Sequence, residues 1–159
     1  MSTIADEIIA KMNATHAKFL AHLAALDAAT VNRRSADERW SPREIVAHLI
    51  DAERAHRRFL QAVVSGSEMP AIENFDLDVW NAARVAKRAG LTVAEVLAEL
   101  EKERAETLAY LPTIPDDAWA RTGAHAALGT VSVEQVARII GLHERLHLQE
   151  MIEGTDAGA

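Results

Sequence analysis

The sequence predicts an all-α protein, a four-helix bundle with one extra short helix, forming a single domain over residues 1–159. Composition is the first reason: 49% of the residues are hydrophobic, alanine is abundant, and only 4% are aromatic. Alanine and leucine with few β-branched runs favour close-packed helices over sheets. The second reason is that three segments begin with the pattern of a capped helix. No segment alternates clearly enough between apolar and polar residues to predict a strand.

Five helices are predicted, and their approximate ranges are 3–28, 42–65, 75–88, 93–111 and 133–153. Three of them start with a capping box, in which a Ser or Thr is followed three residues later by a Glu or Gln. The paired residues are Ser41 and Glu44, Thr92 and Glu95, and Ser132 and Gln135. Apolar residues spaced three and four apart follow each pair, as expected for a helix with one buried face.

The ends of these helices are marked by glycine and proline. Gly66, Gly90 and Gly154 stand where C-terminal caps are expected. Pro112 and Pro115 end the fourth helix, since proline cannot continue it. The connection that follows, about 112–131, is long for a compact bundle and contains Trp119, His125 and Gly129. It is long enough to cross the bundle or to cover the mouth of a pocket.

Charge and composition exclude several classes of function. The net charge is −7, which argues against nucleic acid or an anionic membrane surface as a partner, because both require a basic face. The chain contains no cysteine, so disulfides, thiolate ligands and a cysteine nucleophile are excluded. No signal peptide or membrane-spanning run is apparent. A cytoplasmic protein with a small-molecule substrate is therefore expected.

Three histidines form a candidate metal site. His143 and His147 are four residues apart, which is one helical turn, so both imidazoles project from one face. His48 lies in an earlier helix, close to the face that carries its apolar residues. Three histidine ligands with one position left open are typical of catalytic zinc sites.

The run from His143 to His147 also matches the H-E-x-x-H pattern of zinc peptidases, in which the glutamate acts as general base. Only 12 residues follow His147, and none of them is a histidine. The predicted fold offers no strand on which an extended peptide could dock. We therefore interpret the third ligand as His48 and do not predict a peptidase.

The segment from Trp40 to Glu53, WSPREIVAHLIDAE, resembles the second-helix signature of the DinB/YfiT-like superfamily. The run GTVS at 129–132, followed by His143 and His147, is similar to the last helix of that family. The run DVWN at 78–81 with Arg84 fits the same order, so the resemblance spans nearly the whole chain.

This resemblance implies a four-helix bundle that holds a divalent metal, zinc or nickel, through His48, His143 and His147. Related branches include S-transferases that use low-molecular-weight thiols and a maleylpyruvate isomerase that uses mycothiol, whereas many members have no assigned activity. The resemblance therefore favours a metalloenzyme that activates such a thiol for S-transfer or for a thiol-assisted isomerisation. The alternatives are a noncatalytic metal- or ligand-binding bundle and a metal-dependent hydrolase. A homodimer through helix faces is a further expectation.

Two carboxylates are candidate catalytic residues. Glu144 would accept a proton at the open metal position, or it is a solvated helix residue. Asp51 lies three residues after His48 and would accept a hydrogen bond from an imidazole, or it pairs with Arg54 or Arg58. His125 either approaches the metal or is an ordinary loop residue.

Other residues have structural interpretations. His16, His22 and His56 are expected to be structural or surface residues. Arg54, Arg57 and Arg58 form a basic stripe that would hold an acidic cosubstrate, although pairing of Glu53 with Arg57 is favoured. Gly141 inside the last helix indicates a close approach of another helix.

Overall fold

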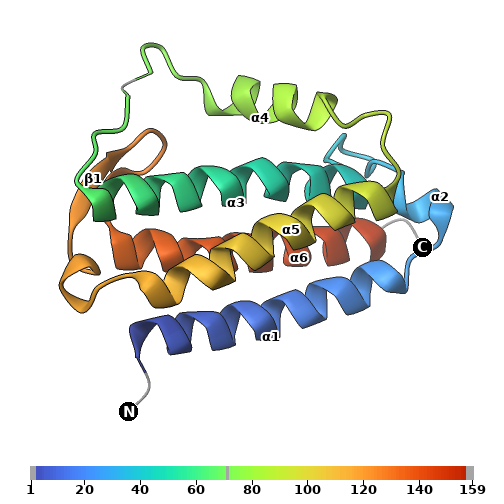
Figure 1. The fold of residues 1–159 in the computed structure, drawn as a ribbon. Coiled ribbons are helices and arrows are strands. Elements are labelled where there is room, and N and C mark those ends of the chain that lie inside the picture. The colour runs from blue at the N-terminus through green and yellow to red at the C-terminus, as the bar shows by residue number, and fades with distance from the viewer. Residues whose placement is uncertain (1–2, 71, 157–159) are drawn as a thin grey trace.

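Four long helices form the body of the protein, as Figure 1 shows. The structure is a computed structural model and describes residues 3–70 and 72–156. The long helices are α1 (Ile4–Ala24), α3 (Pro42–Ser65), α5 (Val93–Tyr110) and α6 (Val133–Asp156). Helix α3 packs against α5 and α6, and α1 packs against α6. The predicted four-helix bundle is thus confirmed.

Six short elements complete the fold. The helix α4 packs on the outside of α3, where it is the predicted extra short helix (Figure 1). The others precede α3 or lie between α5 and α6. The six are α2 (Ala28–Val31), α4 (Leu77–Ala86), η1 (Leu111–Thr113), η2 (Asp116–Ala118), β1 (Thr122–His125) and β2 (Gly129–Ser132). Within the described residues, no helix is both long enough and apolar enough to span a membrane.

The predicted starts of three helices are confirmed by their hydrogen bonds. Ser41 accepts from the backbone N–H of Glu44, whose carboxylate accepts from the N–H of Ser41. Equivalent reciprocal bonds join Thr92 with Glu95 and Ser132 with Gln135. These bonds satisfy N–H groups that have no partner within the helix, which is why the starts can be recognised from sequence.

Several predicted helix ends need correction. The first helix does not run to residue 28: it stops at Ala24, and Asp27 caps the separate helix α2 by accepting from the N–H of Thr30. The last helix runs to Asp156, so Gly154 lies inside it. Gly90 follows α4 by several residues and lacks a positive φ. Gly66 does cap α3, with φ of 72°.

The connection after α5 contains a β-hairpin that the sequence did not predict. Strands β1 and β2 are antiparallel, with Thr122 opposite Ser132 and His125 opposite Gly129. Each strand has only four residues, which is too few for a clear alternation to appear in the sequence. A Cβ atom at Gly123 would lie 2.6 Å from Val63, so this glycine lets the hairpin lie directly on α3.

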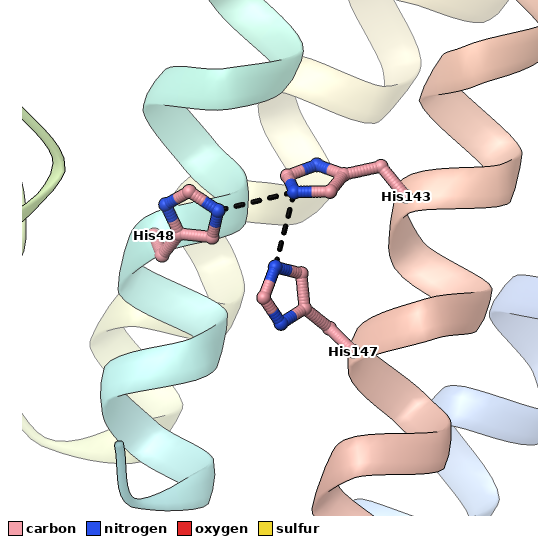
Figure 2. A group of neighbouring side chains, drawn as sticks. All are labelled: His48, His143 and His147. Atoms are coloured by element: carbon pink, nitrogen blue, oxygen red, sulfur yellow. Dashed lines mark hydrogen bonds between the residues drawn. The ribbon is translucent and has the colours of Figure 1, made fainter. Parts of the chain in front are cut away.

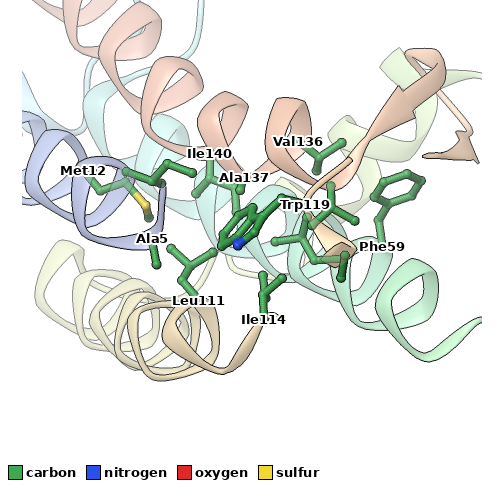
Figure 3. Packing of buried hydrophobic residues seen from close by; sticks show 13 residues of the cluster. Ala5, Met12, Phe59, Leu111, Ile114, Trp119, Val136, Ala137 and Ile140 are labelled. Atoms are coloured by element: carbon green, nitrogen blue, oxygen red, sulfur yellow. The ribbon is translucent and has the colours of Figure 1, made fainter. Parts of the chain in front are cut away.

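The core consists of two hydrophobic clusters. Figure 3 shows the first, the Trp119 cluster, in which Trp119 of the long connection packs between side chains of α6, η1 and α1. Its other buried members are Ala5, Ile8, Met12, Phe59, Leu60, Leu111, Ile114, Ala118, Val133, Val136, Ala137 and Ile140. The second, the Phe19 cluster, has as buried members Phe19, Leu23, Val31, Ile45, Val46, Ala47, Leu49, Ile50, Val96, Leu100, Leu148 and Met151.

A layer of buried polar residues separates the two clusters along all four long helices. On α1, for example, His16 falls between Met12 of the first cluster and Phe19 of the second. The buried members of this polar layer are His16, Asp51, Glu53, Arg57, Glu103, Arg104, Thr107 and Glu144. Buried charges are tolerated only when they are paired, so this layer has to be satisfied internally.

Gly141 marks the close approach of α1 and α6 that the sequence predicted. A Cβ atom at this position would lie 3.0 Å from Cγ of Met12. The two helices therefore come together at the turn of α6 that precedes His143. Glycine lowers intrinsic helix stability, and here it permits tighter helix packing in return.

Candidate metal centre

The three predicted metal ligands meet between α3 and α6. Figure 2 shows His48 on α3 facing His143 and His147 on α6. The Nε2 atom of His143 lies 3.2 Å from Nε2 of His48 and 3.0 Å from Nε2 of His147. One nitrogen from each ring lies within 4.8 Å of the other two, so the three rings are arranged to share one ion.

Neighbouring side chains hold two of these rings in place. The ring of Trp40 packs against His48, with the ring centroids 4.8 Å apart. Nδ1 of His147 lies 2.8 Å from a carboxylate oxygen of Glu150, one turn later on α6. Because the carboxylate accepts this hydrogen bond, Nδ1 of His147 carries the proton and its Nε2 lone pair points toward the other histidines.

His48 and His143 are held neutral near physiological pH. Burial, together with the smaller effect of the neighbouring imidazoles, lowers the pKa of His48 to about 3 and that of His143 to about 2. A neutral imidazole is the form that binds a metal, since one ring nitrogen then has a free lone pair. The environment of these rings therefore favours ligation over protonation.

Hydrogen bonding alone cannot satisfy the cluster well. Nε2 of His147 carries no proton, so the hydrogen bond between these two rings requires the Nε2–H group of His143 as donor. Nε2 of His48 lies near the same His143 nitrogen, so a single N–H group would have to serve both contacts. A divalent ion would instead accept one lone pair from each ring. Tetrahedral zinc with nitrogen ligands at roughly 2.0–2.1 Å places them slightly over 3 Å apart, which fits the observed spacing. The donor set and its geometry thus suit a divalent metal.

Glu144 lies beside this cluster in sequence but points into the polar layer. Its side chain is almost fully buried, and it accepts hydrogen bonds from His16 at 2.5 Å and from Arg104 at 3.2 Å. Arg104 also binds Glu53. Glu144 is therefore not a solvated helix residue, and no hydrogen bond joins it to the three histidines within the described residues.

Asp51 is bound by arginines from two helices. Its carboxylate accepts from Arg88 at 2.5 Å, after α4, and from Arg54 at 3.1 Å. Pairing with Arg54 was one of the two interpretations that the sequence allowed. The other required contact with His48, whose Nδ1 atom is buried and has no hydrogen-bond partner among the described residues.

The predicted pairing of Glu53 with Arg57 is wrong. Both side chains point to α5, where Arg57 binds Glu103 and Glu53 binds Arg104. Residues on facing helices compete with the i,i+4 partner, and here the buried partners across the interface are preferred. Arg54 also binds Glu103. Most of the basic stripe is therefore committed to the polar layer, and only Arg58 is exposed.

His125 and His56 extend the group of histidines toward the hairpin. The rings of His125 and His56 are stacked, with centroids 5.4 Å apart, and His56 meets the edge of His143 at 6.1 Å. The backbone N–H of Ala127 donates to Nδ1 of His125, so a proton on this neutral ring lies on Nε2. The ring of His56 therefore lies between His125 and His143 of the metal centre.

Glu150 and Trp40 are neighbours of the site that the sequence reasoning did not single out. The signal for Glu150 was available, because it lies three residues after His147 and therefore on the same helix face. Trp40 precedes the helix that carries His48. Helical periodicity predicts the direction of side chains only within a helix, so it could not predict where the Trp40 ring lies. Its contact depends on how the chain enters α3.

The fold and the site together define a helical bundle with a three-histidine centre suited to a divalent metal. The chain belongs to the DinB superfamily, whose family model matches residues 11–151. YuaE from Bacillus subtilis is 24% identical over 132 residues, which cover 77% of this chain and 82% of that protein.

Two solved structures share the fold. YfiT from Bacillus subtilis has a TM-score of 0.78 at 21% identity, with 96% of this chain and 86% of that chain covered. It is described as a probable metal-dependent hydrolase with an unusual four-helix bundle topology. A mycothiol-dependent maleylpyruvate isomerase has a TM-score of 0.77 at 17% identity, with 95% of this chain and 63% of that chain covered.

We expect His16 to stabilise the protein in a pH-dependent way. Burial lowers the pKa of His16, but the hydrogen bonds and negative charge of Glu144 and the hydrogen bond to Glu101 outweigh this effect, so the pKa is raised above its usual value. The stabilisation is then fully present below the pKa of the unfolded state and is lost as pH rises through the folded-state pKa.

A His16→Gln variant tests this expectation. Urea unfolding should show a loss of about 2 kcal/mol near pH 6, the order expected for hydrogen bonds to charged groups, and a clearly smaller loss near pH 9. His22→Gln, on the same helix, is the control and should show no such trend. An equal loss at both pH values would contradict a protonated His16.

Proposed function

We propose that this protein is a metalloenzyme that holds one divalent metal, zinc or nickel, through Nε2 of His48, His143 and His147. The observation that carries the proposal is the convergence of three imidazoles, two of which, His48 and His143, are kept neutral by their surroundings. When bound, the metal would lower the pKa of a coordinated thiol or water, which supplies a nucleophile near neutral pH.

The proposed reaction is transfer of a low-molecular-weight thiol to a small-molecule electrophile, or an isomerisation assisted by such a thiol. The chain has no cysteine, so the thiol has to come from a small molecule. The likeness to a mycothiol-dependent isomerase supports this reading, although it establishes only a shared fold. Hydrolysis by activated water is the second candidate, and the description of YfiT favours it.

The protein side chains have separate roles in this proposal. The three histidines bind the metal, and Glu150 orients His147 through its Nδ1 hydrogen bond. Catalytic roles for Glu144 and Asp51 stay predictions from the sequence. Both carboxylates are held by arginines, so each would have to leave an ion pair to accept a proton from a substrate.

A reaction panel tests this function. The metal-loaded protein would be assayed with glutathione, mycothiol, bacillithiol and coenzyme A against a bimane and a dinitrobenzene electrophile. We expect at least one thiol to react faster with the protein than with the His147→Ala variant. A parallel set of ester and amide substrates tests hydrolysis, since those rates should not depend on added thiol. Rates equal to those of His147→Ala throughout both sets would favour a noncatalytic metal-binding bundle.

A further inference from the structure

We infer that Glu53 positions the metal ligand His143 through one water molecule, which is held in a small cavity between the two side chains. The inference rests on the proposed metal site and concerns the other ring nitrogen of His143, Nδ1. The cavity lies between α3, α5 and α6, and the other two proposed metal ligands do not line it. Its polar lining consists of Glu53, His56, Arg104, His143 and Glu144.

The second ring nitrogen of His143 needs a hydrogen-bond partner once the first binds a metal. When Nε2 gives its lone pair to the ion, Nδ1 carries the ring proton and becomes a donor. Ligating histidines almost always donate this proton to a carboxylate, a carbonyl or a water. The hydrogen-bond contacts of His143 with residues 3–70 and 72–156 are both made through Nε2. The acceptor for Nδ1–H is therefore a water molecule.

This nitrogen lies on the side of the ring where the cavity is. Figure 2 shows Nδ1 of His143 on the side of its ring away from His147. Helix α6 lines the cavity with His143, its neighbour Glu144 and Ile140 of the preceding turn, and not with His147. A molecule in the cavity therefore meets Nδ1 without approaching the point where the three Nε2 atoms converge.

The size and lining of the cavity suit one water. Its volume of about 10 Å³ is close to that of a single water-sized sphere, so it excludes any larger ligand. A buried water typically makes two to four hydrogen bonds to polar groups that are otherwise unsatisfied. His143 and the carboxylate of Glu53 supply two such groups. His56 also lines the cavity, and its buried Nδ1 has no hydrogen-bond partner within the described part of the chain.

Glu53 is the carboxylate with the capacity to accept from this water. Its side chain is 4% exposed, and its hydrogen bonds to described residues all come from Arg104. Oε1 of Glu53 accepts one of them, at 2.9 Å, and a carboxylate oxygen can accept two. Glu144 has less capacity, because His16 and both terminal nitrogens of Arg104 already bind it.

The resulting chain of hydrogen bonds runs from Nδ1–H of His143 to the water and from the water to Glu53. A carboxylate in this position fixes the orientation of the ring and raises the basicity of the nitrogen that binds the metal. Glu150 has the same role toward His147 through a direct contact. Two of the three proposed ligands are then oriented by carboxylates, and Glu53 connects the metal centre to the polar layer.

The zinc affinity of the full-length protein, measured by competition with a chromogenic chelator, tests the role of Glu53. Glu53→Gln should weaken zinc binding about tenfold, the lower end of the range for loss of an outer hydrogen-bond partner. Glu103→Gln is the matched control, because Glu103 is equally buried and binds arginines of the polar layer but does not line the cavity. Its zinc affinity should stay within about twofold of that of the unaltered protein. Equal affinities for the two variants would overturn the inference.

Nuclear magnetic resonance of the zinc-loaded protein with isotope-labelled histidine tests the water directly. The Nδ1–H signal of His143 should show a cross-peak to a long-lived water. Glu53→Gln should shift this signal, whereas Glu103→Gln should leave it in place. Absence of the water cross-peak, or a signal unshifted by Glu53→Gln, would overturn the inference and leave the three-histidine site intact. Failure of the unaltered protein to bind zinc would instead overturn the proposed metal site, and this inference with it.

Discussion

Replacement of His143 by alanine is expected to abolish stoichiometric metal binding. The unaltered protein, purified and dialysed against zinc or nickel, should contain about one divalent ion per chain because three imidazoles converge on one point. His143 is the central member, with Nε2 near both other rings. Its loss leaves two ligands, and we expect affinity to fall by more than the roughly 10–100-fold that follows loss of an outer hydrogen-bond partner.

Plasma mass spectrometry and competition with a chromogenic chelator would measure this effect. His22→Ala is the matched control. His22 lies on α1, its ring is hydrogen-bonded to Thr155, and it is not one of the three histidines that converge at the metal centre. Glu150→Gln should give an intermediate result, about tenfold weaker binding, since it removes only the carboxylate that orients His147. Equal metal contents in His143→Ala and His22→Ala would rule out this set of ligands.

Replacement of Arg104 by alanine is expected to destabilise the protein severely. Arg104 is 3% exposed and binds both Glu53 and Glu144, which are themselves buried. Its removal would leave two carboxylates in the polar layer with too few partners. Breaking a buried ion pair in this way typically costs about 3–5 kcal/mol. For a chain of this length, the melting temperature should fall by about 10 °C or more.

Chemical denaturation with matched variants would test that cost. Lys102→Ala changes an exposed cation on the same helix and should alter stability by less than about 0.5 kcal/mol. Adding Glu53→Gln and Glu144→Gln to the Arg104→Met variant should restore part of the lost stability, because the unpaired charges are then removed. A cost below about 1 kcal/mol for Arg104→Ala would mean that the layer is hydrated and not dry.

Local patterns were sufficient to predict most of the helices. Residues 42–65 were predicted and observed as α3, because proline and a capping box mark its start and Gly66 its end. The same kind of signal predicted the start of α5 at Val93. The hairpin of residues 122–132 was missed, since its short strands are stabilised by packing on α3 and not by their own pattern. Local signals therefore predict an element when its stabilising bonds lie within it.

By itself, the sequence determined the candidate ligands of the metal centre. Spacing placed His143 and His147 on one helical face, and the capped helix before them carried His48, so the three could be selected before any contact was known. The lowered pKa values of His48 and His143 depend on burial, which only the folded bundle provides.

Only the tertiary structure decided which charged side chains pair. The sequence favoured Glu53 with Arg57 because they are one turn apart, whereas the structure pairs each with a residue of α5. In the structure, Glu144 is hydrogen-bonded to His16 in the polar layer and not to the three histidines of the metal centre. The reason is physical: helical periodicity specifies the direction of a side chain relative to its own helix, but the partners it meets depend on how the helices pack.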